Sequence, residues 1–138
     1  MNLDDLYFGY LDCLKPLTKT DLLIPDQISI MEQRFGEHIN TYIAIDLDNH
    51  KIVGTASLVI IPRFVDYQSR YKAALIEDVS VLYEYQNKGV GQQLVCYLIN
   101  QAKLADAYKC ILNCSENNKV FYEKLGFKPS ECSMRMDL

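Results

Sequence analysis

Residues 85–94 read YQNKGVGQQL, and this stretch decides how the rest of the chain is interpreted. Two glycines, Gly89 and Gly91, stand one residue apart, after a strand-like run and before a run with helical spacing. The first turn of a helix leaves backbone N–H groups without acceptors, and glycine lets a phosphate approach that backbone closely. Gln86 and Lys88 would add side-chain donors. A tight turn would use the same glycines, so the stretch alone leaves both interpretations open.

The composition is that of an ordinary globular domain. The chain has 138 residues, of which 49% are hydrophobic and 23% charged, enough for one domain with a real core. The net charge of −4 and the absence of a basic cluster argue against non-specific nucleic-acid binding. No apolar run is long enough to span a bilayer, and residues 1–5 have no basic signal-like segment, so we expect no membrane association and a cytoplasmic location.

The five cysteines follow no disulfide framework, and we interpret them as reduced thiols. Cys110 and Cys114 are four residues apart, which raises the question of a zinc site. The two histidines, His38 and His50, are distant in sequence, and structural zinc needs four convergent ligands. We therefore expect no metal site.

Hydrophobic spacing predicts helices and strands on both sides of the opening stretch. Before that stretch we expect a helix within 3–14 that ends near Pro16, and a second helix from an N-cap at Asp26 towards Gly36. A hairpin of strands 41–47 and 51–61, ended by Pro62, follows, and then a loop over 63–72 and a strand over 73–83. The rest of the chain should form a helix over about 89–107, a strand over 109–114, a helix over about 117–125 and a terminal strand over 133–138. The strand over 109–114 is apolar enough to be covered on both faces.

Two motifs resemble one protein family. The pattern Q-x-x-G-x-G at 86–91, placed after a strand and at a helix start, resembles the acyl-CoA pyrophosphate loop of the GNAT superfamily of N-acetyltransferases. The run NNKVFYEKLGF at 117–127 resembles the last helix of that superfamily. The resemblance implies a single α/β (α+β) domain over residues 1–138, with a mixed, mostly antiparallel sheet flanked by helices. The first strand of the family, before the N-terminal helix, has no counterpart in the sequence.

Three further segments are similar to one branch of the superfamily, the glucosamine-6-phosphate N-acetyltransferases. They are TASLVIIPRF (55–64), IEDVSV (76–81) and YKCILNCSENN (108–118), within a likeness that covers roughly 50–128. This resemblance implies acetyl transfer from acetyl-CoA to an amino sugar phosphate, on the way to UDP-N-acetylglucosamine, in a homodimer. Two alternatives stay open: an acetyltransferase for another small amine or a peptide N-terminus, and a CoA-binding regulatory module without turnover.

The resemblance also implies the catalytic residues. Tyr122 matches the tyrosine near the sulfur, which stabilises or protonates the departing thiolate; the alternative is a core aromatic. Glu77 and Asp78 would orient the amine and the sugar hydroxyls; the alternative is a pair of exposed strand carboxylates. On a regular strand these two neighbours face opposite sides, with Glu77, Val79 and Val81 on one side and Asp78 and Ser80 on the other. No covalent intermediate is required.

The cofactor candidates come from the two motifs and from the strand backbone, which would run along the pantetheine like an added strand. They are Val79, Ser80, Val81, Gln86, Asn87, Lys88, Gly89, Val90, Gly91, Asn118 and Tyr122. Asn118 is equally compatible with a residue of the N-cap region. Asn87 stands where many members have glycine, and asparagine tolerates left-handed backbone better than most residues.

The acceptor candidates are carboxylates, an amide and cations. They are Glu77, Asp78, Lys109, Asn113, Arg63 and Arg135, with Arg70 as a further cation. Lys109 is the strongest cation because it lies inside the matching block, whereas Arg63 and Arg135 would reach the site of a partner subunit. Asn113 replaces an acidic residue of the relatives, and an amide cannot act as a base. That task would then fall to Glu77, Asp78 or water.

Overall fold

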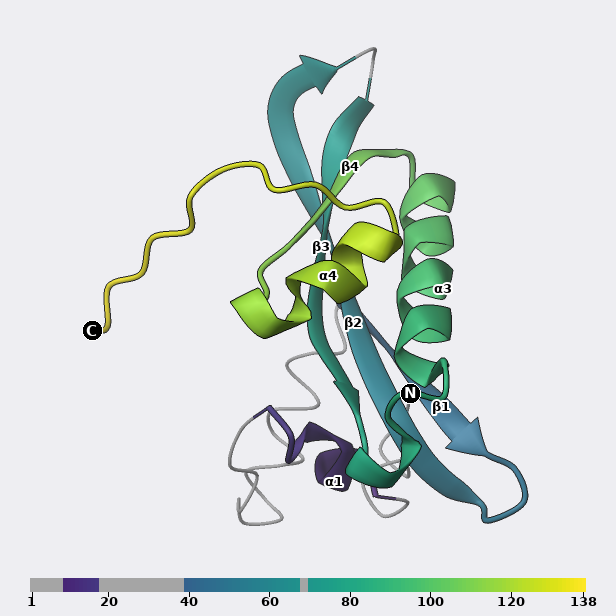
Figure 1. Cartoon of the computed structure of the whole chain (residues 1–138). Coiled ribbons are helices and arrows are strands. Elements are labelled where there is room, and N and C mark those ends of the chain that lie inside the picture. Colours follow the sequence, from purple (N-terminus) through teal and green to yellow (C-terminus); the bar gives the residue numbers. More distant parts are fainter. Residues whose placement is uncertain (1–8, 18–38, 68–69) are drawn as a thin grey trace.

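The computed structural model describes residues 9–17, 39–67 and 70–138 (Figure 1). Its elements are α1 (Tyr10–Leu14), β1 (Ile39–Asp46), β2 (Lys51–Tyr67), β3 (Arg70–Val81), the 3-10 helix η2 (Tyr83–Tyr85), α3 (Val90–Leu104), β4 (Ala107–Leu112) and α4 (Glu116–Lys124). The helix predicted to follow Asp26 lies outside the described residues, as do residues 3–8 of the one predicted within 3–14. The described part of that prediction contains α1, which begins after Gly9 and ends near Pro16 as predicted.

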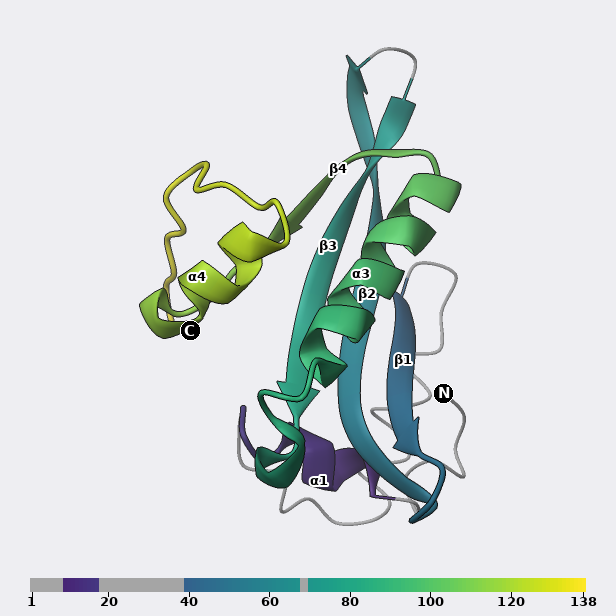
Figure 2. The ribbon, with the colours of Figure 1, turned by 45° about the vertical axis from the view of Figure 1, so that its right-hand side comes forward.

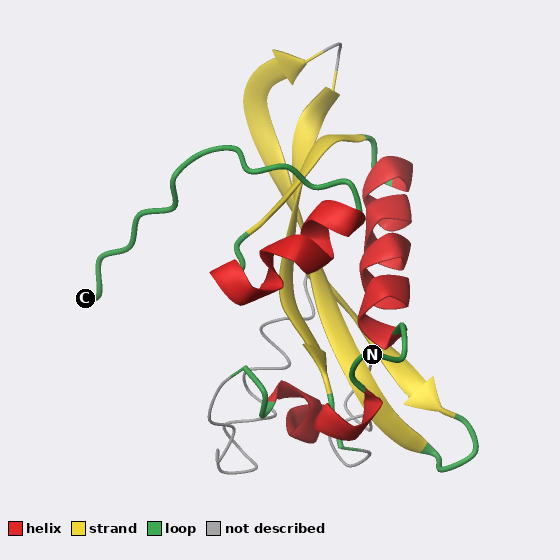
Figure 3. Ribbon diagram, viewed as in Figure 1, coloured by secondary structure: helices red, strands yellow, loops and turns green. Residues whose placement is uncertain are grey.

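The four strands form one sheet in the order β1-β2-β3-β4. The first two pairings are antiparallel and the last, between β3 and β4, is parallel. Side chains of both α3 and α4 join the same core cluster, and α1 lies at the end of the sheet where β3 finishes (Figures 1 and 3). The predicted class, a mixed and mostly antiparallel sheet flanked by helices, is confirmed.

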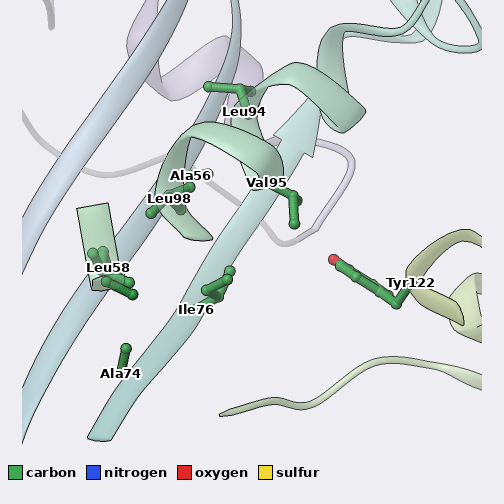
Figure 4. Close-up of a cluster of buried hydrophobic side chains, with 9 residues drawn as sticks. Ala56, Leu58, Ala74, Ile76, Leu94, Val95, Leu98 and Tyr122 are labelled. Carbon is green, nitrogen blue, oxygen red and sulfur yellow. The ribbon is translucent and has the colours of Figure 1, made fainter. Parts of the chain in front are cut away.

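The main core lies between the sheet and α3, with Leu58 and Ile76 from the strands facing Leu94, Val95 and Leu98 of the helix (Figure 4). Burying apolar surface of this kind is the chief stabilising term in a domain of this size. Gly54 lets α3 approach β2 closely, because a Cβ there would lie 3.0 Å from Leu94 Cδ1.

The loop predicted over 63–72 is wrong. Strand β2 continues through Pro62 to Tyr67, and β3 begins at Arg70, so residues 63–67 and 70–72 belong to the two strands of an extended hairpin arm. Pro62 is paired with Lys72, and the register then shifts before the next pair, Tyr67 and Arg70. The arm extends beyond the helices (Figure 1), and Phe64 is fully exposed. The sequence RFVDYQSRYK lacks the alternation by which a half-buried strand is recognised.

Two boundaries near the C-terminus also differ from the prediction. Strand β4 covers Ala107–Leu112, two residues earlier than predicted, because α3 ends at Leu104 and Asp106 turns the chain with a φ of 61°. It is a half-buried edge strand, so the expected cover on both faces is wrong. The terminal strand predicted over 133–138 is also wrong, since this tail follows α4 without regular structure (Figure 3). A strand needs a neighbour for its backbone hydrogen bonds.

Candidate active site

An opening separates the two parallel strands at one end of the sheet. The pairing of β3 with β4 ends at Ile76 and Leu112, whereas β3 itself continues to Val81 (Figure 2). β4 ends at Leu112, and the chain leads from there to α4. Along a strand, alternate backbone N–H and C=O groups point to each side, so part of the backbone of residues 77–81 faces the opening instead of a neighbouring strand.

A β-bulge lies at the same place on β3. Ser57 is paired with Glu77 and Thr55 with Ser80, so Asp78 and Val79 together oppose one residue of β2. Asp78 has a left-handed φ of 52°, which aspartate tolerates better than most residues.

The bulge overturns the predicted alternation beyond Glu77. Val79 packs on the same core cluster as Ile76, whereas Glu77 lies on the face of its partner Ser57. The side chain of Ser80 is buried beside Thr55, and its Oγ has no hydrogen-bond partner within the described parts of the chain. Glu77 itself is exposed and Asp78 is half-buried.

The glycine-containing stretch forms the turn between η2 and α3. Asn87 has a φ of 58° and Gly89 a φ of 85°, so the predicted left-handed tolerance of Asn87 is confirmed. The N–H of Gln93 donates to the Gly89 carbonyl at 3.0 Å, which starts the helix ladder. The preceding amides, from Val90 to Gln92, therefore have no acceptor within the helix. They mark the partially positive end of a 15-residue helix.

The side chains around this turn are held in several ways. Gln86 Nε2 donates a hydrogen bond to the Val81 carbonyl at 3.0 Å, which ties the turn to the end of β3. The ammonium of Lys88 lies 5.3 Å from the centre of the Tyr85 ring. Gly91 faces inward, because a Cβ there would lie 3.5 Å from Phe121 and 3.6 Å from Val81. The packing interpretation therefore fits Gly91, whereas the space around Gly89 is open.

Tyr122 reaches the core from α4 with only 9% of its surface exposed. Its ring packs edge-to-face against Phe121 and Phe127, with centroid separations of 4.9 and 5.9 Å. In Figure 4 its hydroxyl end points across the cluster towards the Val95 side. Burial, and to a smaller extent electrostatic interaction with Cys114, raises the pKa of Tyr122 above its ordinary value. The hydroxyl therefore keeps its proton at neutral pH.

The acceptor candidates are only partly brought together. Lys109 of β4 is paired with Ala73 of β3, so its side chain lies on the face of the sheet that also carries Glu77. Glu77 is four positions beyond Ala73, on the order of 13 Å along the strand. Asn113 is exposed in the connection between β4 and α4, and Asn118 is exposed in the first turn of α4.

The three candidate arginines lie elsewhere. Arg63 is on the hairpin arm, Arg70 lies 3.8 Å from Asp106, and Arg135 pairs with Asp137 in the C-terminal tail. None of the three lies on the stretch of β3 that lines the opening. No group of His, Cys, Asp or Glu in the described residues could hold a metal ion, and no described helix could cross a membrane.

Sequence reasoning missed two features of the site. The bulge at Asp78 has no local signature, since aspartate in a strand normally indicates only exposure. A hydrogen bond from Tyr85 to Asp46, across 39 positions of sequence, also has none. Both depend on how β2 is placed against its neighbours.

The chain matches the model of the "Acetyltransferase (GNAT) family" over residues 5–127. It is 37% identical over 130 residues to a glucosamine 6-phosphate N-acetyltransferase of Trypanosoma brucei brucei. That alignment covers 94% of this chain and 84% of the relative. It is 31% identical to glucosamine 6-phosphate N-acetyltransferase 1 of Dictyostelium discoideum over 141 residues, covering 100% of this chain and 88% of the relative.

Two solved structures are similar as well. The structure of glucosamine-6-phosphate N-acetyltransferase from Arabidopsis thaliana has a TM-score of 0.89 at 29% identity, covering 99% of this chain and 94% of that one. A Trypanosoma brucei acetyltransferase also has a TM-score of 0.89, at 35% identity, covering 100% of this chain and 96% of that one.

The family match and the relatives identify the class of protein as an acetyl-CoA-dependent N-acetyltransferase, and the sheet order and the glycine turn at the start of α3 agree with it. With the family match over most of its length, the chain belongs to the GNAT family of acetyltransferases.

Proposed function

We propose that this protein transfers the acetyl group of acetyl-CoA to the 2-amino group of glucosamine 6-phosphate, giving N-acetylglucosamine 6-phosphate. The observation that carries the proposal is the opening between β3 and β4 with the N-terminus of α3 at its mouth. The similarity to several glucosamine 6-phosphate N-acetyltransferases supports the acceptor. The product would serve UDP-N-acetylglucosamine synthesis in the cytoplasm.

The cofactor would bind along the opening. Within the predicted stretch 86–91, the Gln86 N–H already donates to the Tyr83 carbonyl at 3.3 Å. The amides that follow it would hold the pyrophosphate at the helix terminus, with the Lys88 ammonium beside them. The backbone of residues 79–81 would pair with the pantetheine, as an added strand does. Asn118, exposed at the start of α4, would contact the cofactor from the other side of the opening.

The chemistry needs an unprotonated amine beside the thioester and a proton for the leaving thiolate. Glu77 and Asp78 would orient the amine and sugar hydroxyls, with water or one of these carboxylates accepting the proton. Tyr122 would protonate or stabilise the thiolate, and burial keeps that phenol protonated. Holding both substrates in one site converts an encounter between two molecules into a step within one complex. The amine attacks directly, so no acyl-enzyme forms.

Acceptor selectivity provides the first test. The Lys109 ammonium is our candidate for the 6-phosphate, and Asn113 would bind a hydroxyl. A charge-assisted hydrogen bond to phosphate contributes about 1.5–3 kcal/mol, so glucosamine without the phosphate should lose roughly tenfold to a hundredfold in kcat/KM. Lys109→Ala should shrink this preference and leave the acetyl-CoA KM unchanged. The measurement is CoA release with a panel of amino sugars, each with and without the phosphate.

Lys103→Ala provides the control, because Lys103 is an exposed cation in the last turn of α3. Equal rates for glucosamine and its 6-phosphate would remove the proposed acceptor. Acetylation of a different small amine or of a peptide would leave only the acetyltransferase class. CoA binding without any CoA release would indicate a regulatory module instead.

We propose further that the enzyme is a homodimer. The tail carries an alternating run, with Met134, Met136 and Leu138 exposed between polar residues. The arm adds the exposed Phe64, and β4 is an edge strand. Exposed apolar side chains and open strand edges are features that subunit association covers. In such a dimer, Arg63 and Arg135 of one subunit would contribute to the phosphate site of the other.

Light scattering at micromolar concentration should therefore give the mass of two chains. Met134→Asp combined with Met136→Asp should shift the protein towards the monomer, because each change places a charge on the apolar side of the tail. Asp137→Asn is the control in the same tail, since it leaves the apolar side intact. A wild-type monomer would remove the dimer and, with it, the roles proposed for Arg63 and Arg135.

A further inference from the structure

The turn between β1 and β2 contacts the segment that leads into the cofactor loop. Asp46, the last residue of β1, accepts hydrogen bonds from Asp48 N at 3.0 Å, from Asn49 N at 3.3 Å and from Asn49 Nδ2 at 2.7 Å. The Tyr85 hydroxyl donates another to Asp46 Oδ2 at 2.7 Å. These donors, the Asn49 side chain first and Tyr85 next, lower the pKa of Asp46 to about 2. The carboxylate is therefore charged at neutral pH and already fixed by its own turn.

Tyr85 occupies the position through which this turn can act on the loop. It is the last residue of η2, directly before the turn at 86–89. Its ring is half-buried against the second core cluster, which includes Ile52 and Leu82. The Lys88 ammonium lies over the same ring, 5.3 Å from its centre. One side chain thus connects a fixed carboxylate, a core cluster and the cation of the loop.

A second contact joins the same two segments. Lys51, the first residue of β2, pairs with Glu84 in η2 at 3.0 Å. Both side chains are exposed, so this ion pair contributes little by itself. It nevertheless engages the one acidic residue of η2, whose charge would otherwise compete with the cofactor for Lys88. The Tyr85–Asp46 hydrogen bond and the Lys51–Glu84 ion pair both hold η2 against this end of the β1–β2 hairpin.

We propose that Asp46 and Tyr85 are positioning residues for the cofactor, which hold the loop at 86–89 and Lys88 in the conformation that receives the pyrophosphate. The inference rests on the proposed function, because it takes that loop as the phosphate site. A loop held in its binding conformation before the ligand arrives loses less conformational entropy on binding. The contact should therefore affect cofactor affinity and leave the acetyl-transfer step unaltered.

Tyr85→Phe tests this with the loss of one hydroxyl, since the ring that packs on the core and under Lys88 remains. The Kd of CoA, measured by isothermal titration calorimetry, and the KM of acetyl-CoA should both rise about threefold to tenfold, because the lost hydrogen bond acts on the cofactor indirectly, through the loop, and should cost no more than one typical intramolecular hydrogen bond. At saturating acetyl-CoA, kcat and the KM of the amino sugar should stay within about twofold of wild type, by the same argument of ground-state binding.

Matched variants separate positioning from general stability. Tyr83→Phe removes a hydroxyl from the same 3-10 helix, where the side chain is 71% exposed, and should leave the Kd of CoA unchanged. Asp46→Asn keeps an acceptor for Tyr85 and should weaken CoA binding less than Asp46→Ala. In the Asp46→Ala background, Tyr85→Phe should have no further effect, because the contact is already gone.

Each outcome bears on one of the two proposals. If the wild-type protein does not bind CoA, the proposed function fails. If the wild type binds CoA and Tyr85→Phe binds it equally well, the positioning role is wrong while the proposed function stands. A loss that falls equally on the KM values of both substrates and on the melting temperature would also overturn the positioning role, because it would indicate a general loss of structure.

Discussion

Tyr122→Phe is expected to lower kcat by about 10²–10⁴-fold, the range for loss of a general acid, and to leave the Kd of CoA close to the wild-type value. Two properties of Tyr122 account for this, the packing of its ring and the proton on its hydroxyl. The ring is fixed by Phe121 and Phe127, and phenylalanine preserves those edge contacts. Burial raises the pKa of Tyr122, so wild-type enzyme holds the proton that the leaving thiolate needs. Single-turnover acetyl transfer at saturating acetyl-CoA measures the effect on the chemical step.

Tyr97→Phe is the control for a lost tyrosine hydroxyl elsewhere in the molecule. Tyr97 lies on α3, where it is exposed, with its ring 5.1 Å from that of Tyr42 on β1. The Tyr97→Phe variant should retain the wild-type kcat. If Tyr122→Phe also turns over at the wild-type rate, Tyr122 is a core aromatic and the proton comes from another donor or from water.

Gly89→Val is expected to raise the KM of acetyl-CoA on the order of a hundredfold, because two effects combine. The φ of 85° at Gly89 is a conformation that costs a β-branched residue about 1–3 kcal/mol, so the turn would change shape. A branched side chain at the helix terminus would also occupy the space where the pyrophosphate approaches the amides. Steady-state kinetics over a range of acetyl-CoA concentrations, with the melting temperature alongside, provides the measurement.

A graded series distinguishes the role of this turn from packing. Gly89→Asn should be mild, because asparagine tolerates left-handed backbone and the surrounding space is open. Gly91→Val should act differently, since its side chain would press on Phe121 and lower stability. A folded Gly89→Val enzyme with an unchanged acetyl-CoA KM would return Gly89 to a purely conformational role.

Much of the fold was predictable because its signals are local. The spacing of Leu94, Leu98 and Ala102 predicts the helix after the glycine turn, and all three are buried. Gly126 predicts the end of the last helix, and its φ of 94° agrees with a helix C-terminus. The turn at 48–50 predicts the β1–β2 hairpin, which is observed. The order of the two motifs predicts the acetyltransferase family.

The errors have a common physical cause, which is that the local pattern carries no information about neighbours. Residues 63–67 and 70–72 are extended because β2 and β3 pair beyond the core, and their sequence has no alternation that indicates a strand. Residues 133–138 alternate like a strand and yet are unpaired within the described chain, because alternation indicates a face to bury and does not supply the neighbour.

The sequence by itself determined the class of this protein and the identity of its candidate residues. A Gly-containing turn at a helix start and the NNKVFYEKLGF run are contiguous signals, each complete within a few residues. The tertiary structure alone decided how those residues are arranged. It set the bulge that turns Glu77 and Val79 to different faces, the end of β3–β4 pairing at Ile76, and the contact of Tyr85 with Asp46. These features depend on strand register and on contacts between distant segments, which are set only when the whole sheet has formed.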